Sequence, residues 1–181
     1  MQSHARDSAE RVSVTLRPAV AGLFFATLTL LFGFGLGIVF GYNEDAIKSR
    51  LAASAAAVRD TVYQGNEATI KPVLDKSWVY MQRAHLHAGA LGTTAVALTL
   101  TLGLLGAGSR WTRPISLGLG LGGLGYSVYW LWAGFRAPGL GGTTAAKESL
   151  KWLAMPSSGA VVIATVAVAV WLAMVSLRPR R

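Results

Sequence analysis

Four long stretches of the sequence contain no charged residue, and this pattern constrains the fold more than any other feature. They cover about residues 19–41, 88–108, 115–135 and 159–177. About 20 apolar residues in a helix cross the hydrocarbon core of a bilayer, because a helix rises about 1.5 Å per residue. The sequence therefore predicts an all-α integral membrane protein with four transmembrane helices packed as a bundle.

The composition agrees with this class and excludes several others. Hydrophobic residues make up 52% and charged residues 14% of the 181 residues, whereas a soluble domain carries about 25% charged residues. The lack of cysteine excludes disulfides, thiolate metal sites, iron–sulfur clusters and covalently attached c-type haem. The net charge of +9 requires no nucleic acid, because membrane proteins gather Lys and Arg at their cytoplasmic ends and against anionic lipid.

The placement of lysine and arginine predicts the topology. Basic residues are densest in the tail Arg178-Pro-Arg-Arg181 and in the short turn with Arg110 and Arg113, and such segments face the cytoplasm. We therefore expect a multi-pass protein of a bacterial inner membrane with both termini cytoplasmic. The first charge-free run is about twice as long as the apolar region of a signal peptide, which favours an uncleaved anchor.

The expected segments follow from these spans. They are a cytoplasmic N-terminal segment (1–18), a first span (19–41), an extracytoplasmic helical segment (42–77), a second span with its interfacial lead-in (78–108), a cytoplasmic turn (109–114), a third span (115–135), an extracytoplasmic loop (136–158), a fourth span (159–177) and a basic cytoplasmic tail (178–181). Pro114 and Pro156 precede the last two spans and predict helix starts, with Ser157 or Ser158 as the cap of the fourth helix.

The segment 42–77 has helical features of its own. Asn43 with the two acids after it predicts a helix start. An apolar stripe then follows at helical spacing, which makes the segment amphipathic: Ile47, Leu51, Val58 and Val62. This amphipathic helix extends the first hairpin outside the membrane, either protruding as part of a helical pair or lying flat on the bilayer.

Small residues recur at fourfold spacing within the spans. Because apolar side chains gain little from leaving lipid, close backbone approach over small residues supplies much of the contact energy between membrane helices. The sequence therefore predicts helix packing through a set of glycines: Gly33, Gly37, Gly41, Gly92, Gly118 and Gly122. These glycines have two alternative packing partners. One is the other helices of the same bundle, and the other is a second copy of the chain or a partner membrane subunit.

The segment that leads into the second span holds the candidate site. His85 and His87 lie about 200° apart around a helix and so point to nearly opposite sides. His85 shares a face with Trp78 and Met81, a set that suits a copper ion or a haem edge. His87 shares another face with Tyr80 and Arg83, which suits an anionic head group, a propionate or a quinone carbonyl.

The cofactor assignment stays open between haem b, copper and none. The His85-Leu86-His87 pattern is similar to the motif by which haem-copper oxidases direct two imidazoles to two haems; the similarity covers three residues, and the other ligand helices of that family are absent. Interfacial histidines also occur at head-group level because they are amphipathic. Five aromatic residues near the end of the third span predict either an interfacial belt or a stacking platform for a quinone or porphyrin: Tyr126, Tyr129, Trp130, Trp132 and Phe135.

Two functional hypotheses result. The sequence carries no nucleotide-binding loop, no zinc-protease motif and no acidic residue within a span, which disfavours an enzyme, a proton relay and a transporter. The abundant packing cues favour an accessory or assembly subunit of a membrane complex. The alternative is a redox membrane protein that holds haem or copper near the outer interface at His85 or His87.

Overall fold

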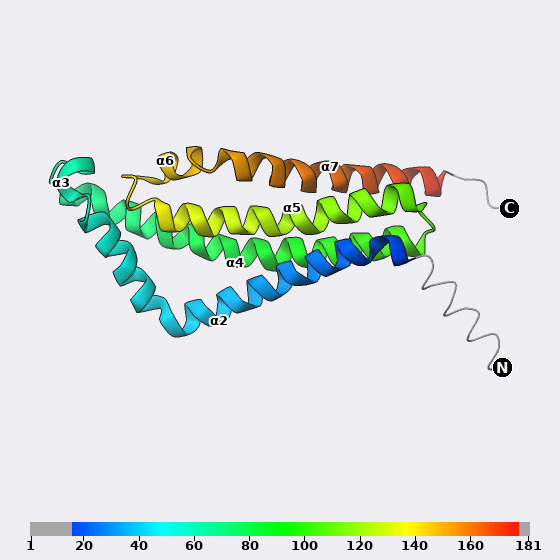
Figure 1. Ribbon diagram of the computed structural model, residues 1–181, viewed down its shortest axis with the longest axis horizontal. Coiled ribbons are helices and arrows are strands. Elements are labelled where there is room, and N and C mark those ends of the chain that lie inside the picture. The colour runs from blue at the N-terminus through cyan, green and yellow to red at the C-terminus, as the bar shows by residue number, and fades with distance from the viewer. Residues whose placement is uncertain (1–15, 178–181) are drawn as a thin grey trace.

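The computed structural model describes residues 16–177, and all of their regular structure is helical, as predicted. The elements are a 3-10 turn η1 (Arg17–Ala19) and the helices α2 (Val20–Ala56), α3 (Arg59–Val62), α4 (Glu67–Leu104), α5 (Ser109–Arg136), α6 (Thr143–Glu148) and α7 (Lys151–Ser176). The long helix α5 is central: it packs against α2, α4 and α7, whereas α7 packs almost entirely on α5 (Figure 1).

Three of the helices are long and apolar enough to cross a membrane: residues 17–56 with η1 included, residues 67–104 and residues 151–176. The fourth expected span lies in α5, which is long enough but less apolar. Glycine occupies five of the eight positions 118–125, and glycine contributes no apolar side chain. The same glycines let the neighbouring helices approach α5 closely, which explains its central place in the fold.

The helices begin earlier than their prolines predicted. Pro114 and Pro156 lie inside α5 and α7, more than one turn after each helix starts. A proline there removes a single backbone hydrogen bond near the helix end, a smaller loss than in the helix centre. The predicted serine caps are wrong as well, because Ser157 is buried against α5 and the Ser158 hydroxyl donates to the Ala154 carbonyl over 2.8 Å.

Helix α2 is bent at Asn43, where the sequence predicted a separate helix to begin. The backbone of Asn43 (φ −125°, ψ 21°) leaves the helical region, yet the helix continues to Ala56. Up to this bend α2 diverges from α4, and beyond it α2 turns back toward the α3 end of the molecule (Figure 1). The second half then packs on the bundle, with Leu51 buried beside Met81.

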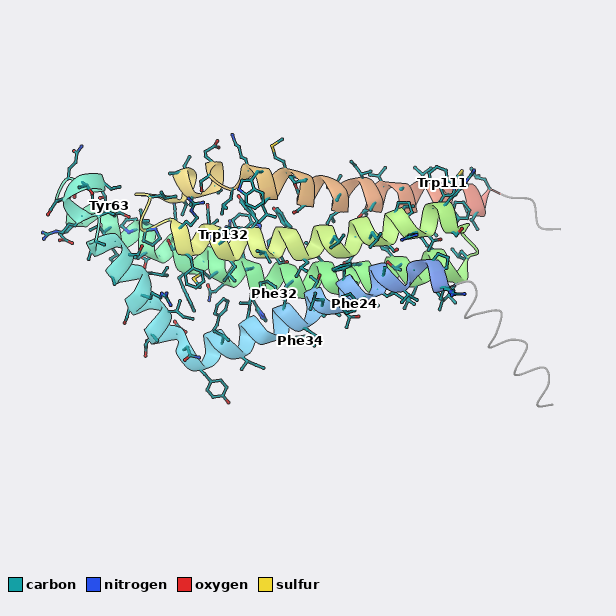
Figure 2. All side chains as sticks on the ribbon, viewed as in Figure 1. Phe24, Phe32, Phe34, Tyr63, Trp111 and Trp132 are labelled. Carbon is teal, nitrogen blue, oxygen red and sulfur yellow. The ribbon has the colours of Figure 1, made fainter. Side chains whose placement is uncertain are left out.

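Tyr63 connects two loops at the α3 end of the molecule through a hydrogen bond. Its hydroxyl donates a hydrogen bond to the Pro138 carbonyl over 2.7 Å, and the side chain is buried. Burial also raises the pKa of the Tyr63 phenol, because the phenolate would lose its hydration. Tyr63 therefore fastens the α3–α4 corner to the loop that follows α5 (Figure 2).

Helices α2 and α5 pack closely at two glycines, with Gly22 of α2 against Ser116 of α5 and Gly120 of α5 against the backbone of α2. A Cβ added to Gly120 would lie 2.7 Å from the Gly22 carbonyl oxygen and 3.0 Å from the backbone nitrogen of Ala26. The Thr29 hydroxyl donates its proton to the Phe25 carbonyl of its own helix over 2.8 Å, and it also lies 3.3 Å from the Gly120 carbonyl oxygen across the same contact. Neither Gly22 nor Gly120 was among the packing glycines predicted from the sequence.

Candidate functional site

The predicted glycine stripe on α2 positions the first histidine. A Cβ on Gly37 would lie 2.9 Å from the His85 Cε1 atom, and a Cβ on Gly33 would lie 3.0 Å from the Ala88 Cβ. The absence of side chains at these two positions lets α4 approach α2 closely enough for the imidazole to fit. Gly41, the third member of the stripe, contacts nothing within 4 Å, because α2 has diverged from α4 before its bend at Asn43.

The other three predicted packing glycines also face helices of the same chain. A Cβ on Gly92 would lie 2.8 Å from the Leu30 side chain of α2. A Cβ on Gly122 would lie 2.8 Å from the Val161 side chain of α7, and a Cβ on Gly118 would lie 3.3 Å from the Ala164 Cβ of the same helix. Five of the six predicted packing glycines therefore pack against another helix of the described chain, and Gly41 does not.

His85 donates a hydrogen bond across the α2–α4 contact. Its Nδ1 lies 2.8 Å from the carbonyl oxygen of Gly33, and a carbonyl oxygen can only accept, so the proton is on Nδ1. In the neutral imidazole the other ring nitrogen, Nε2, is then the one with a free lone pair. His85 also lines a groove of about 400 Å³ with Trp78 and Glu44.

Met81, the predicted partner of His85 as a metal ligand, lies in the core. Its side chain is fully buried in the core, where it fills the space left by Gly134 of α5. Met81 also lies in one apolar cluster with Leu36 and Phe40 of α2, the helix that His85 contacts, and the pair His85 and Met81 stays a prediction. Within residues 16–177, no group of three or more His, Cys, Asp or Glu side chains is placed to hold a metal ion.

His87 faces α5, on the other side of α4, as its angular separation from His85 predicts. Its Nδ1 donates to the Arg83 carbonyl over 2.7 Å. The ring stacks on Trp130 with centroids 5.8 Å apart, and it meets Tyr126 edge-on at 5.2 Å. The imidazole of His87 is thus held between its own helix and two rings of α5.

The structure brings the predicted set Tyr80, Arg83 and His87 together around one indole. Tyr80 meets Trp130 edge-on with centroids 4.8 Å apart, and the Arg83 guanidinium lies 5.1 Å from the Trp130 centroid. Such a cation over an aromatic face is attracted by the ring quadrupole. The Nε1 atom of Trp130 is buried without a hydrogen-bond partner, a feature that no pattern in the sequence could have indicated.

The aromatic belt predicted for α5 is divided between two faces. Tyr129 and Trp130 turn inward toward α4 and join the cluster around His87. Trp132 and Phe135 stay exposed, and Trp132 meets Trp152 of α7 with ring centroids 6.2 Å apart. Only the exposed part is placed as an interfacial belt would be.

Comparison of the chain with protein-family models, with curated proteins and with solved structures finds no match.

Proposed function

We propose that the chain is an accessory or assembly subunit of a membrane complex in a bacterial inner membrane. In this proposal α2, α4, α5 and α7 form a four-helix transmembrane bundle with both termini in the cytoplasm. The outer surface of α2 then provides the docking site for a transmembrane helix of a partner subunit.

The observation that carries this proposal is an apolar seam on α2. Phe24, Leu31 and Ile38 recur every seven residues, and Val20 and Phe34 each lie four residues before one of them. All five side chains are 59–63% exposed, and this heptad spacing is the one by which helices pack knobs into holes. The buried residues of α2 recur at the same spacing on the other side of the helix, so this seam faces away from the bundle.

Gly41 extends the same seam. It lies seven residues after Phe34 and is the one predicted packing glycine with no neighbour within 4 Å. Small residues on membrane helices favour close approach of a partner helix. Gly41 lines the groove that also holds His85, and it is available there for a contact that the described chain does not make.

The described interior supports a packing role. Within residues 16–177 the buried polar side chains are all serine or threonine. Most of their hydroxyls bind backbone carbonyls, such as Ser127 to Gly123 over 2.8 Å and Ser77 to Val73 over 2.7 Å. Ion and proton pathways through membrane proteins use ionisable side chains that face the bundle interior, so this interior suits a scaffold better than a transporter.

Photo-crosslinking from the seam tests the partner. A photoreactive phenylalanine replaces Phe34 in one variant and Ile163, which is 72% exposed on α7, in the control. We expect one discrete protein adduct from position 34 in native membranes and none from position 163. If both positions gave lipid adducts and no protein adduct, or if position 34 formed an adduct with a second copy of this chain, the result would contradict a partner subunit.

Reporter fusions test the orientation. An alkaline phosphatase fused after Gly108, in the α4–α5 turn, should be inactive because that turn is expected to be cytoplasmic. The same enzyme fused after Gly142, at the start of α6, should be active. The reverse pattern would contradict the proposed topology.

One observation favours a second candidate function, a haem- or copper-binding redox protein. Histidines that ligate metals commonly donate their other ring nitrogen to a backbone carbonyl, which is how His85 binds Gly33. Its Nε2 is then the nitrogen available to an iron or copper ion. The test is absorbance and metal analysis of protein purified from its native membrane. A Soret band or stoichiometric copper that is lost in His85→Ala but kept in His87→Ala would support this candidate, and colourless, metal-free protein would exclude it.

A further inference from the structure

A groove opens at the end of the molecule opposite α3, where Figure 2 labels Trp111. It has a volume of about 450 Å³ and lies between the beginning of α5 and the last turns of α7, with one residue from α4. Its walls are mostly apolar, and the residues that matter here are Leu102, Arg110, Trp111, Ile115, Val170 and Met174. The two ends of this wall differ: Leu102 is fully buried, whereas Trp111 and Met174 are half exposed. The groove therefore leads from the protein core to the outer surface.

Arg110 is the one charged residue of this groove. Its guanidinium lies 5.4 Å from the centroid of the Trp111 ring, and no carboxylate within residues 16–177 forms an ion pair with it. The same end of the molecule carries Arg17 and Arg113, and the first turn of α5 adds the positive end of a long helix dipole.

The acidic residues of the described chain lie at the other end. All six occur in the second half of α2, in α3, in the first turns of α4 or in α6: Glu44, Asp45, Asp60, Glu67, Asp75 and Glu148. The groove thus combines an apolar slot with a cation that has no ion-pair partner among the described residues, at the end of the molecule that also carries Arg17 and Arg113. This combination is complementary to an amphiphile with a negative head.

We infer that this groove binds an anionic phospholipid, with an acyl chain between α5 and α7 and the phosphate beside Arg110. Basic pockets between transmembrane helices on the cytoplasmic side bind anionic lipid head groups through this chemistry. Trp111 suits the position of the head group, because an indole prefers the membrane–water interface. The inference rests on the proposed membrane insertion and is independent of the partner proposed for α2.

Native mass spectrometry of the full-length chain in detergent tests the site. The protein is titrated with phosphatidylglycerol and, separately, with phosphatidylcholine of the same acyl chains. We expect the first phosphatidylglycerol to bind several-fold more tightly than the first phosphatidylcholine. Arg110→Gln should weaken phosphatidylglycerol binding about fivefold, the factor that one basic residue contributes at an anionic membrane surface, and should leave phosphatidylcholine binding unchanged.

Arg136→Gln is the matched control, because it removes the same charge from the opposite end of the same helix. Equal affinity of the wild type for the two lipids, an unchanged Arg110→Gln variant, or an equal loss in Arg136→Gln would each overturn the inference. Alkaline carbonate extraction of native membranes separates the two proposals. A chain released by carbonate refutes membrane insertion itself, whereas a retained chain without lipid preference refutes only the lipid site.

Discussion

Gly120→Ala should destabilise the fold by forcing α2 and α5 apart. The new Cβ would lie 2.7 Å from the Gly22 carbonyl oxygen and 2.9 Å from the Phe25 Cβ. These atoms belong to the backbone or are attached directly to it, so no side-chain rotation relieves the contact. Ordinary van der Waals separation would need a shift of roughly 0.7 Å or more between the two helices.

The expected magnitude is the difference of two effects. Overpacking in a well-packed core costs about 1–3 kcal/mol. Replacing glycine by alanine within a helix returns about 0.5–1 kcal/mol, because the unfolded chain becomes less flexible. The net loss in the free energy of unfolding should therefore be about 1–2 kcal/mol for Gly120→Ala. The shift should also lengthen the 3.3 Å contact between the Thr29 hydroxyl and the Gly120 carbonyl oxygen, while the hydrogen bond from Thr29 to Phe25 within α2 is kept.

Gly35→Ala provides the matched control. Gly35 lies in the exposed middle of α2 with nothing within 4 Å of an added Cβ, so this variant gains helix propensity without a clash. Both variants are unfolded by sodium dodecyl sulfate from mixed micelles and followed by circular dichroism. The reasoning is refuted if Gly120→Ala is as stable as Gly35→Ala or more stable than the wild type.

Three further predictions concern single side chains. Thr99 and Thr112 are both fully buried, but only the Thr112 hydroxyl has a hydrogen-bond acceptor. Thr112→Val should therefore lower the free energy of unfolding by about 1 kcal/mol, whereas Thr99→Val should raise it by a similar amount. Equal effects of the two substitutions in the micelle unfolding assay would contradict this prediction. Burial raises the folded-state pKa of the Tyr63 phenol above its ordinary value of 10.0, so the stability that this phenol provides is complete below pH 10 and falls as the pH rises through the folded-state pKa. The difference in unfolding free energy between the wild type and Tyr63→Phe should therefore narrow only above pH 10. A difference that stays constant with pH would argue against the raised pKa of Tyr63. Gly41→Leu should stabilise the fold by about 0.5–1 kcal/mol through its gain in helix propensity, because an added Cβ meets nothing there. It should nevertheless reduce the protein adduct formed from position 34, and undiminished crosslinking would remove Gly41 from the proposed seam.

The helices themselves follow from local properties of the chain. Charge-free apolar runs predict helices wherever they occur, because a backbone in lipid must satisfy its own hydrogen bonds. The opposite directions of His85 and His87 follow in the same way from the angle between neighbouring residues of a helix. The prolines were less informative, since the energy of one lost hydrogen bond is small enough for packing and the preceding residues to start each helix earlier.

The composition and the charge-free runs of this sequence were enough to determine that it is helical and to show where its long helices lie. Only the tertiary structure decided which glycines meet another helix, that Met81 belongs to the core, that an added Cβ on Gly41 would meet nothing, and that Nδ1 of His85 binds Gly33, 52 residues away in the chain. These features depend on the bend at Asn43 and on how α2 and α4 cross α5. Such crossings arise from contacts between distant residues, and one-dimensional spacing records only which face a residue occupies on its own helix.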